Sequence, residues 1–266
     1  MTQTRTGPNP SSVLAFLSDE VARPRASNMI FIGNPGTGKS AVARLLGKAY
    51  HELGILRKPK FLEVERMDLV GRTPQQTIAK TREVIEEARG GILFIDEAYT
   101  LGLPSKRSKP EAGMDAINEL IASIDAADED PNDDSHPMVV LSGFPVEMVG
   151  FLAAQQNFQK RFSLTYEFPD YTCPELAQIF IDLVHTKGFD LESSVTLNVI
   201  SSLLDRETSS TWRAERNGRI CELLLAGART EVRKRLRRAN FEETEEVDPQ
   251  LIFRSDLEAV MRDEFK

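Results

Sequence analysis

The motif GNPGTGKS at residues 33–40 is the part of this sequence whose residue types and spacing most directly indicate chemistry. It fits the pattern G-x-x-x-x-G-K-[ST] at every fixed position, and its glycines let successive backbone N–H groups turn toward one anion. The charge of Lys39 suits the β- and γ-phosphates of a nucleotide, and the Ser40 hydroxyl suits Mg²⁺. The residues predicted to contact the nucleotide are Gly33, Asn34, Pro35, Gly36, Thr37, Gly38, Lys39, Ser40 and Ala41.

A second motif, ILFIDEAY at residues 92–99, ends an apolar segment with two carboxylates, Asp96 and Glu97. Parallel α/β sheets bind ligands at the edge where their strands end. In ATPases with a phosphate-binding loop, an aspartate at this place holds Mg²⁺ and an adjacent glutamate can act as general base on the attacking water. The alternative is an acidic cap on a strand end, but the loop upstream favours a hydrolytic role.

The segments that must position these motifs alternate between strand and helix patterns. Short apolar runs predict strands at 29–32, 61–64, 92–95, 138–141 and 164–168, and helical spacing is found at 41–53, 77–88 and 114–124. Strands alternating with helices indicate a parallel, doubly wound sheet. Beyond residue 169 the patterns predict only helices, at 173–185, 193–205 and 219–238. A short helix is also expected at 13–21.

Composition narrows the class of protein. The 266 residues carry a formal net charge of −8 at a pI near 5.1, which argues against a general affinity for nucleic acid. The sequence has no apolar run long enough for a membrane helix and no N-terminal secretory signal. Cys173 and Cys221 are interpreted as reduced thiols, and the scattered histidines predict no metal site. We expect location in the cytoplasm, or in an organelle stroma or matrix.

The acidic stretch 125–134 is interpreted as a solvated loop.

Four motifs occur in an order that resembles one family. GNPGTGKS, DLVG at 68–71, GGILFIDEAY at 90–99 and EFPDYT at 167–172 are together similar to the AAA+ ATPases of the CbbX/CfxQ and stage V sporulation protein K group. The resemblance implies Mg²⁺-dependent ATP binding and hydrolysis by a ring, usually a hexamer, that remodels a protein partner. The ring could be homo-oligomeric or mixed, and the client is unknown.

The resemblance also implies a fold: an α/β AAA+ module with a five-stranded parallel sheet sandwiched by helices, followed by a small all-helical lid subdomain. We expect an N-terminal tail and short helix at 1–28, the nucleotide-binding subdomain at 29–170, and the lid with a C-terminal tail at 171–266.

The family's functional residues match particular positions here. Lys39 and Ser40 match the phosphate and magnesium ligands, while Asp96 and Glu97 match the metal-side and catalytic carboxylates. Arg161 matches an arginine that reaches the γ-phosphate of the neighbouring subunit, where it stabilises charge in the transition state. Arg219 matches a lid arginine that senses the bound nucleotide. The alternative for Arg161 and for Arg219 is a surface arginine.

Departures from the family pattern support a second hypothesis. Thr73 and Pro74 stand where related proteins carry an aromatic-aliphatic pair that grips substrate in the ring pore, and neither offers a large apolar surface. The segment that helps to enclose the adenine is expected to be shortened or absent. The alternative function is an ATP-binding regulatory or structural subunit of a mixed assembly that threads nothing itself. A small-molecule kinase or a nucleic-acid motor is disfavoured by the Asp96-Glu97 pair and by the net charge, respectively.

Overall fold

The computed structural model describes residues 26–103, 112–129, 135–242 and 248–265. The helix expected at 13–21 therefore lies outside the described residues. The chain divides into two compact units. The first includes Val42–Leu141 and Leu152–Leu164, and the second includes Ile30–Ala41, Ser142–Phe151 and Thr165–Lys266.

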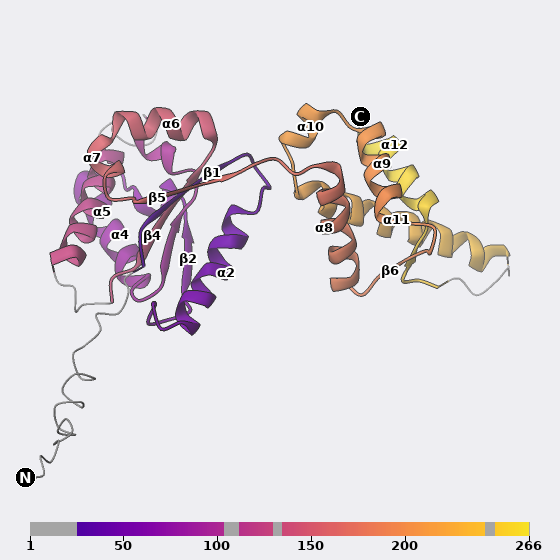
Figure 1. Ribbon diagram of the computed structural model, residues 1–266, viewed down its shortest axis with the longest axis horizontal. Helices are drawn as coiled ribbons and strands as arrows, with labels where there is room; N and C mark the ends of the chain where they lie inside the picture. The colour runs from indigo at the N-terminus through magenta and orange to yellow at the C-terminus, as the bar shows by residue number, and fades with distance from the viewer. Residues whose placement is uncertain (1–25, 104–111, 130–134, 243–247, 266) are drawn as a thin grey trace, which may run out of the picture. The chain divides into compact units, whose positions relative to one another are not determined.

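A five-stranded sheet forms in the order β2-β3-β4-β1-β5, which confirms the predicted doubly wound α/β fold (Figure 1). Its strands are β1 (Met29–Gly33), β2 (Phe61–Val64), β3 (Ile92–Ile95), β4 (Met138–Gly143) and β5 (Leu164–Phe168). Strand β3 pairs in parallel with β2 and β4, and Ile92 lies opposite Phe61 and Met138. All four residues of β3 are buried, as expected for a continuous apolar strand that is covered on both faces.

The helices associated with the sheet are α2 (Lys39–Glu52), α3 (Arg66–Leu69), α4 (Pro74–Glu87), α5 (Ala112–Glu129), α6 (Pro145–Ala154) and α7 (Gln156–Gln159), with a 3₁₀ turn at Ala98–Gly102. Helix α2 packs closely on β3, because a Cβ added at Gly47 would lie 3.1 Å from Ile92 Cδ1. Figure 1 shows α2 on one side of the sheet and α4 with α5 on the other.

Helix α5 corrects the interpretation of the acidic stretch. The helix continues to Glu129, so Asp125 lies on a helix and not in a solvated loop. The physical reason is that Ile124 and Ala127 continue the buried face of α5 through the acidic residues. The helical spacing of the apolar residues determines the local structure here, and the charged residues lie on the face of α5 opposite the buried one. Residues 130–134 lie outside the described part.

Thr73 and Pro74 begin helix α4, three residues before the predicted start. The Thr73 hydroxyl accepts a hydrogen bond from the Gln76 N–H at 3.3 Å, and Pro74 occupies the first turn, where a missing N–H costs nothing. Two buried threonines then attach α4 to the DLVG segment: Thr77 accepts from the Gly71 N–H and Thr81 donates to the Leu69 carbonyl. Thr73 and Pro74 thus have a local structural role as a helix start.

The C-terminal part of the second unit is helical, as predicted. It contains α8 (Cys173–Thr186), α9 (Leu197–Glu207), α10 (Ser210–Ala214), α11 (Arg219–Glu242) and α12 (Arg254–Glu264). Two very short strands, β6 (Asp190–Leu191) and β7 (Leu251–Ile252), pair in parallel, and two residues are too few for a sequence pattern to reveal. The helices share a core of fully buried apolar side chains that includes Leu176, Phe180, Ile200, Ile220 and Leu257.

A membrane-spanning helix is not found in the described ranges, since none of the helices there is both long and apolar enough.

Candidate functional site

The loop between β1 and α2 has the conformation that its glycines were expected to provide. Gly36 and Gly38 adopt positive φ angles of 75° and 90°, which residues with side chains rarely adopt. The Lys39 side chain lies within the loop, and its ammonium donates to the carbonyl oxygens of Gly33 at 2.7 Å and Asn34 at 2.8 Å. Lys39 is only 8% exposed. The loop therefore holds a buried cation at the start of a helix.

These features fit a phosphate group. The loop supplies backbone N–H groups in left-handed turns, the Lys39 ammonium, and the positive end of the 14-residue helix α2. Ser40 lies in the first turn of the same helix and is partly exposed. The arrangement could hold the phosphates of a nucleotide, with the Ser40 hydroxyl available to a bound Mg²⁺.

A turn that precedes α11 lies directly against this loop. The Gly218 N–H donates to the Gly36 carbonyl at 3.0 Å, and the Asn217 side-chain amide donates to the Pro35 carbonyl at 3.1 Å. Asn217 is 1% exposed and has a φ of 47°, so it occupies the left-handed region that asparagine tolerates better than most residues. The approach is close, because a Cβ at Gly36 would lie 2.1 Å from the Arg216 carbonyl oxygen.

Asp170 and Tyr171, within the EFPDYT motif, complete this connection. Asp170 accepts hydrogen bonds from the side-chain amides of Asn34 and Asn217, each at 2.9 Å. The Tyr171 N–H donates to Asn217 Oδ1 at 2.9 Å, and its hydroxyl donates to the Thr37 carbonyl at 3.0 Å. Burial raises the pKa of Tyr171, so the hydroxyl keeps its proton as a donor. The sequence indicated the motif but not these roles. The Asn-Gly dipeptide at 217–218, a turn signal, was the available clue.

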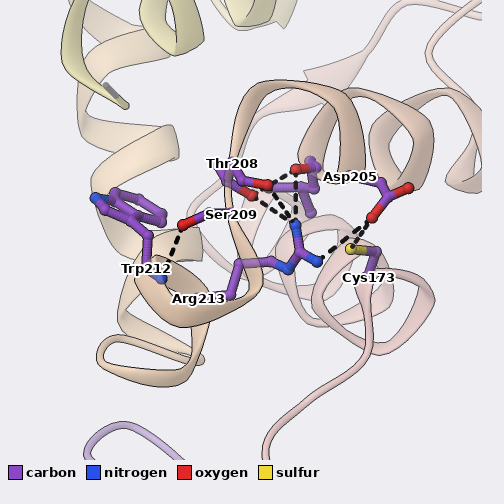
Figure 2. Close-up of polar contacts among 7 residues, drawn as sticks. Cys173, Asp205, Thr208, Ser209, Trp212 and Arg213 are labelled. Carbon is purple, nitrogen blue, oxygen red and sulfur yellow. Dashed lines mark hydrogen bonds and ion pairs between the residues drawn. The ribbon is translucent and has the colours of Figure 1, made fainter.

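Arg213 stabilises the segment that leads into the turn (Figure 2). Its guanidinium donates to the Thr208 carbonyl at 2.7 Å and to the Thr208 hydroxyl at 2.9 Å, and it forms an ion pair with Asp205 at 3.4 Å. The bonds to Thr208 occupy acceptors just beyond the end of α9, and the ion pair with Asp205 joins α10 to the last turn of that helix. Ser209 caps α10 by accepting from the Trp212 N–H. Cys173 also faces Asp205, and burial raises the pKa of its thiol, consistent with an unreactive cysteine.

Asp96 and Glu97 follow β3 in the first unit. Asp96 Oδ1 accepts a hydrogen bond from the Glu97 N–H at 3.0 Å. Glu97 has φ 46° and ψ 44°, a left-handed conformation that is strained for glutamate. Burial raises the pKa of Glu97, and the charges of Asp96 and Glu65 raise it further. A strained carboxylate with a raised pKa is typical of a general base.

Arg161 is held by its own chain. Its guanidinium forms a two-pronged ion pair with Asp125, with distances of 2.7 Å from Nε to Oδ1 and 2.6 Å to Oδ2. It also donates to the Asn157 side chain at 3.0 Å. These hydrogen bonds lower the pKa of Asp125 and raise that of Arg161. Any role toward a neighbouring subunit requires Arg161 to exchange this partner for another.

Arg219 lies beside the phosphate-binding loop at the start of α11. Its Cγ would be 3.4 Å from a Cβ at Gly36, and the side chain is exposed. Within the described ranges its guanidinium has no hydrogen bond or ion pair, so it is available to a ligand. The second unit therefore brings together the loop, Lys39 and Arg219. The first unit holds Asp96, Glu97 and Arg161.

Two family models match this chain, one in each half of the sequence. Residues 29–166 match the model of the ATPase family associated with various cellular activities (AAA). Residues 170–264 match a domain of unknown function, DUF8495. Among solved structures, the FIGL-1 AAA domain in complex with ADP aligns with a TM-score of 0.55 at 16% identity, covering 89% of this chain and 71% of that one. This likeness supports the fold.

Curated relatives include proteins that the motifs suggested. Stage V sporulation protein K of Bacillus subtilis is 35% identical over 73% of this chain and 58% of its own length. Protein CbbX of Cereibacter sphaeroides is 40% identical over 62% of this chain and 50% of its own length. The ESX-3 secretion system protein EccA3 of Mycolicibacterium smegmatis is 35% identical over 64% of this chain and 27% of its own length. The chain thus spans about half the length of two of these relatives and less of the third.

Replacement of Asn217 tests the contact between the turn and the loop. Asn217→Ala removes the amide hydrogen bonds and places an unsuitable residue at positive φ, so it should lower the free energy of unfolding by about 2 kcal/mol or more. Asn217→Gly removes the same hydrogen bonds but tolerates the backbone conformation, so its loss should be smaller. Urea denaturation of the full chain measures both variants. Equal stability of the alanine variant and the wild type would contradict the structural role of Asn217.

Proposed function

The chain belongs to the ATPase family associated with various cellular activities (AAA), within the group of stage V sporulation protein K, CbbX and CfxQ, and on this premise we propose that it binds and hydrolyses ATP. The observation that carries the proposal is the buried Lys39 ammonium inside a glycine loop at the start of a helix. A lysine ammonium beside the backbone N–H groups of a glycine loop, at the N-terminus of a helix, is the combination that suits the phosphates of a nucleotide.

In this proposal the phosphates of ATP lie in the loop of residues 33–41, where backbone N–H groups and Lys39 bind them. Ser40 and Asp96 would hold a Mg²⁺ ion, which neutralises charge on the phosphates. Arg219 has an available guanidinium beside the loop and contributes a further contact to the nucleotide. The Asn217 turn keeps the loop in its phosphate-binding conformation.

Glu97 is the proposed general base. Its carboxylate accepts a proton from the attacking water, and its raised pKa brings its basicity closer to neutral pH than that of an ordinary glutamate. The left-handed backbone at Glu97 sets the direction of the side chain at the end of β3. Asp96 shares the strand end and fixes the Glu97 N–H by a hydrogen bond.

We also propose that the protein acts as a ring that remodels a protein partner, with Arg161 reaching the nucleotide of a neighbouring subunit. The two-pronged geometry by which Arg161 binds Asp125 would suit phosphate oxygens equally well. The alternative is a regulatory or structural subunit of a mixed assembly. The observation in its favour is that Thr73 and Pro74 serve as a helix start and offer no aromatic surface to a substrate.

Hydrolysis and its pH dependence test the role of Glu97. Glu97→Gln should lower steady-state ATP hydrolysis about 10²- to 10⁴-fold, because an amide cannot accept the proton. The wild-type rate should fall as the pH is lowered through the raised pKa of Glu97, since the protonated carboxyl is not a base. The residual rate of the variant should not show this titration. Equal hydrolysis by wild type and variant, with both proteins folded, would contradict the proposal.

Mixing two inactive variants tests the role of Arg161 in trans. Arg161→Ala alone should reduce hydrolysis about 10³-fold or more while ATP still binds. Mixed with Glu97→Gln, it should regain activity, because a site with an intact Glu97 then meets an intact Arg161 from its neighbour. Asp125→Asn serves as a control that weakens the ion pair but keeps Arg161, and it should remain active. Failure to regain activity at any mixing ratio would contradict a ring with a shared site.

A further inference from the structure

The carboxylate of Asp170, between β5 and α8, accepts hydrogen bonds from two side-chain amides. Its Oδ1 accepts from Asn217 Nδ2 and from Asn34 Nδ2, each at 2.9 Å, and its Oδ2 accepts from Asn34 Nδ2 at 3.1 Å. Within the described ranges no lysine or arginine pairs with this carboxylate. Asp170 thus places a negative charge beside a loop whose other features suit a phosphate. Because like charges repel, its presence here indicates a contribution other than direct binding.

The side-chain amide of Asn217 requires a hydrogen-bond acceptor at position 170. Its oxygen accepts from the Tyr171 N–H at 2.9 Å, so its nitrogen must lie on the opposite side of the amide. That nitrogen also donates to the carbonyls of Pro35 at 3.1 Å and Ala214 at 2.9 Å. Backbone groups therefore fix the direction in which this amide faces, and an oxygen at position 170 is the side-chain atom that matches it.

The loop and the turn differ in how far they depend on Asp170. The loop has hydrogen bonds of its own, since the Thr37 hydroxyl donates to the Asn34 carbonyl at 2.8 Å. The turn is bonded to the loop through the Gly218 N–H and the Asn217 side chain, and Asp170 holds that side chain. Asp170 therefore contributes mainly to the position of the turn.

Arg219 follows this turn directly and begins α11. Its N–H donates to the Arg216 carbonyl at 3.0 Å, which joins it to the turn. Its Cγ would lie 3.4 Å from a Cβ at Gly36, so the side chain begins beside the loop. A shift of the turn would therefore move the Arg219 guanidinium relative to phosphates bound in the loop, and such contacts depend closely on position.

We propose, on the basis of the ATP site proposed above, that Asp170 is a positioning residue, which holds Arg219 against the nucleotide phosphates through the Asn217 turn. Asp170 itself does not bind the nucleotide. Its charge alone would give the opposite effect, because removal of a negative charge beside bound phosphates should tighten binding. Loss of the position of Arg219 should weaken binding, so the sign of the change distinguishes the two.

Calorimetric titration of the full chain with Mg²⁺ and the β,γ-imido analogue of ATP, which is not hydrolysed, tests the proposal. Asp170→Ala should raise the Kd about tenfold, since the charged hydrogen bonds that hold the turn are lost. Arg219→Ala should raise it at least as much. Adding Asp170→Ala to Arg219→Ala should change the Kd by less than about twofold, because the guanidinium that Asp170 positions is already absent.

Two further variants serve as controls. Asp170→Asn removes the charge but keeps an oxygen for the Asn217 amide, so its Kd should stay within about twofold of the wild type. Asp182→Ala, on α8, also removes an exposed carboxylate that accepts from a side-chain amide, that of Gln178 at 2.9 Å. It should bind like the wild type. Circular dichroism checks that each variant is folded, and Asp170→Ser, whose hydroxyl is too short to reach Asn217, repeats the test of the alanine variant.

Three results would overturn the role of Asp170 while leaving the ATP site intact. The first is unchanged or tighter binding by the folded Asp170→Ala and Asp170→Ser variants. The second is an undiminished effect of Asp170→Ala in the Arg219→Ala background, which would show that Asp170 acts through the loop. The third is a loss in Asp170→Asn as large as that in Asp170→Ala. Absence of binding by the folded wild type would instead contradict the ATP site, and the role of Asp170 with it.

Discussion

The hydrogen bonds between the Asn217-Gly218 turn and the phosphate-binding loop are the contact on which the arrangement of the second unit depends. Gly36 must lack a side chain for its own φ and also for the close approach of the turn. Asp170 joins the side chains of Asn34 and Asn217, so the loop is bonded to the segment that begins α8 and to the one that begins α11. A change in loop conformation would therefore disturb the hydrogen bonds at the start of α8 and at the start of α11.

Strained backbone conformations are found at two residues of the candidate site, Glu97 and Asn217. Among the described residues other than glycine, only Glu97 and Asn217 have positive φ. Each is held by hydrogen bonds: Glu97 by one to its neighbour Asp96, and Asn217 by bonds to Pro35, Asp170 and Tyr171, which are distant in sequence. Residues persist in such conformations when the surroundings compensate the cost, and such sites are common where function needs a fixed direction. The raised pKa of Glu97 is a second feature that is typical of a functional carboxylate.

The fold was largely predictable from the sequence, and the site only in part. Apolar runs such as 92–95 specify buried strands locally, and the glycine loop carries its own conformational requirement. The pairing of Arg161 with Asp125 joins residues far apart in sequence, and the Asp125 position was misread because its charges masked a helical face. The bonds of Asn217 and Asp170 to the loop also depend on tertiary contacts, which spacing along the chain does not reveal. The roles of Lys39, Glu97, Arg161 and Arg219 remain predictions.

The central claim is that the loop around Lys39 is the nucleotide site, and calorimetric titration with ATP and Mg²⁺ tests it most directly. The wild type should give one saturable binding event. Lys39→Ala should abolish it, because the charge that faces the phosphates is lost, while Glu97→Gln should bind ATP as the wild type does. Tight binding by Lys39→Ala, or none by the folded wild type, would contradict the account.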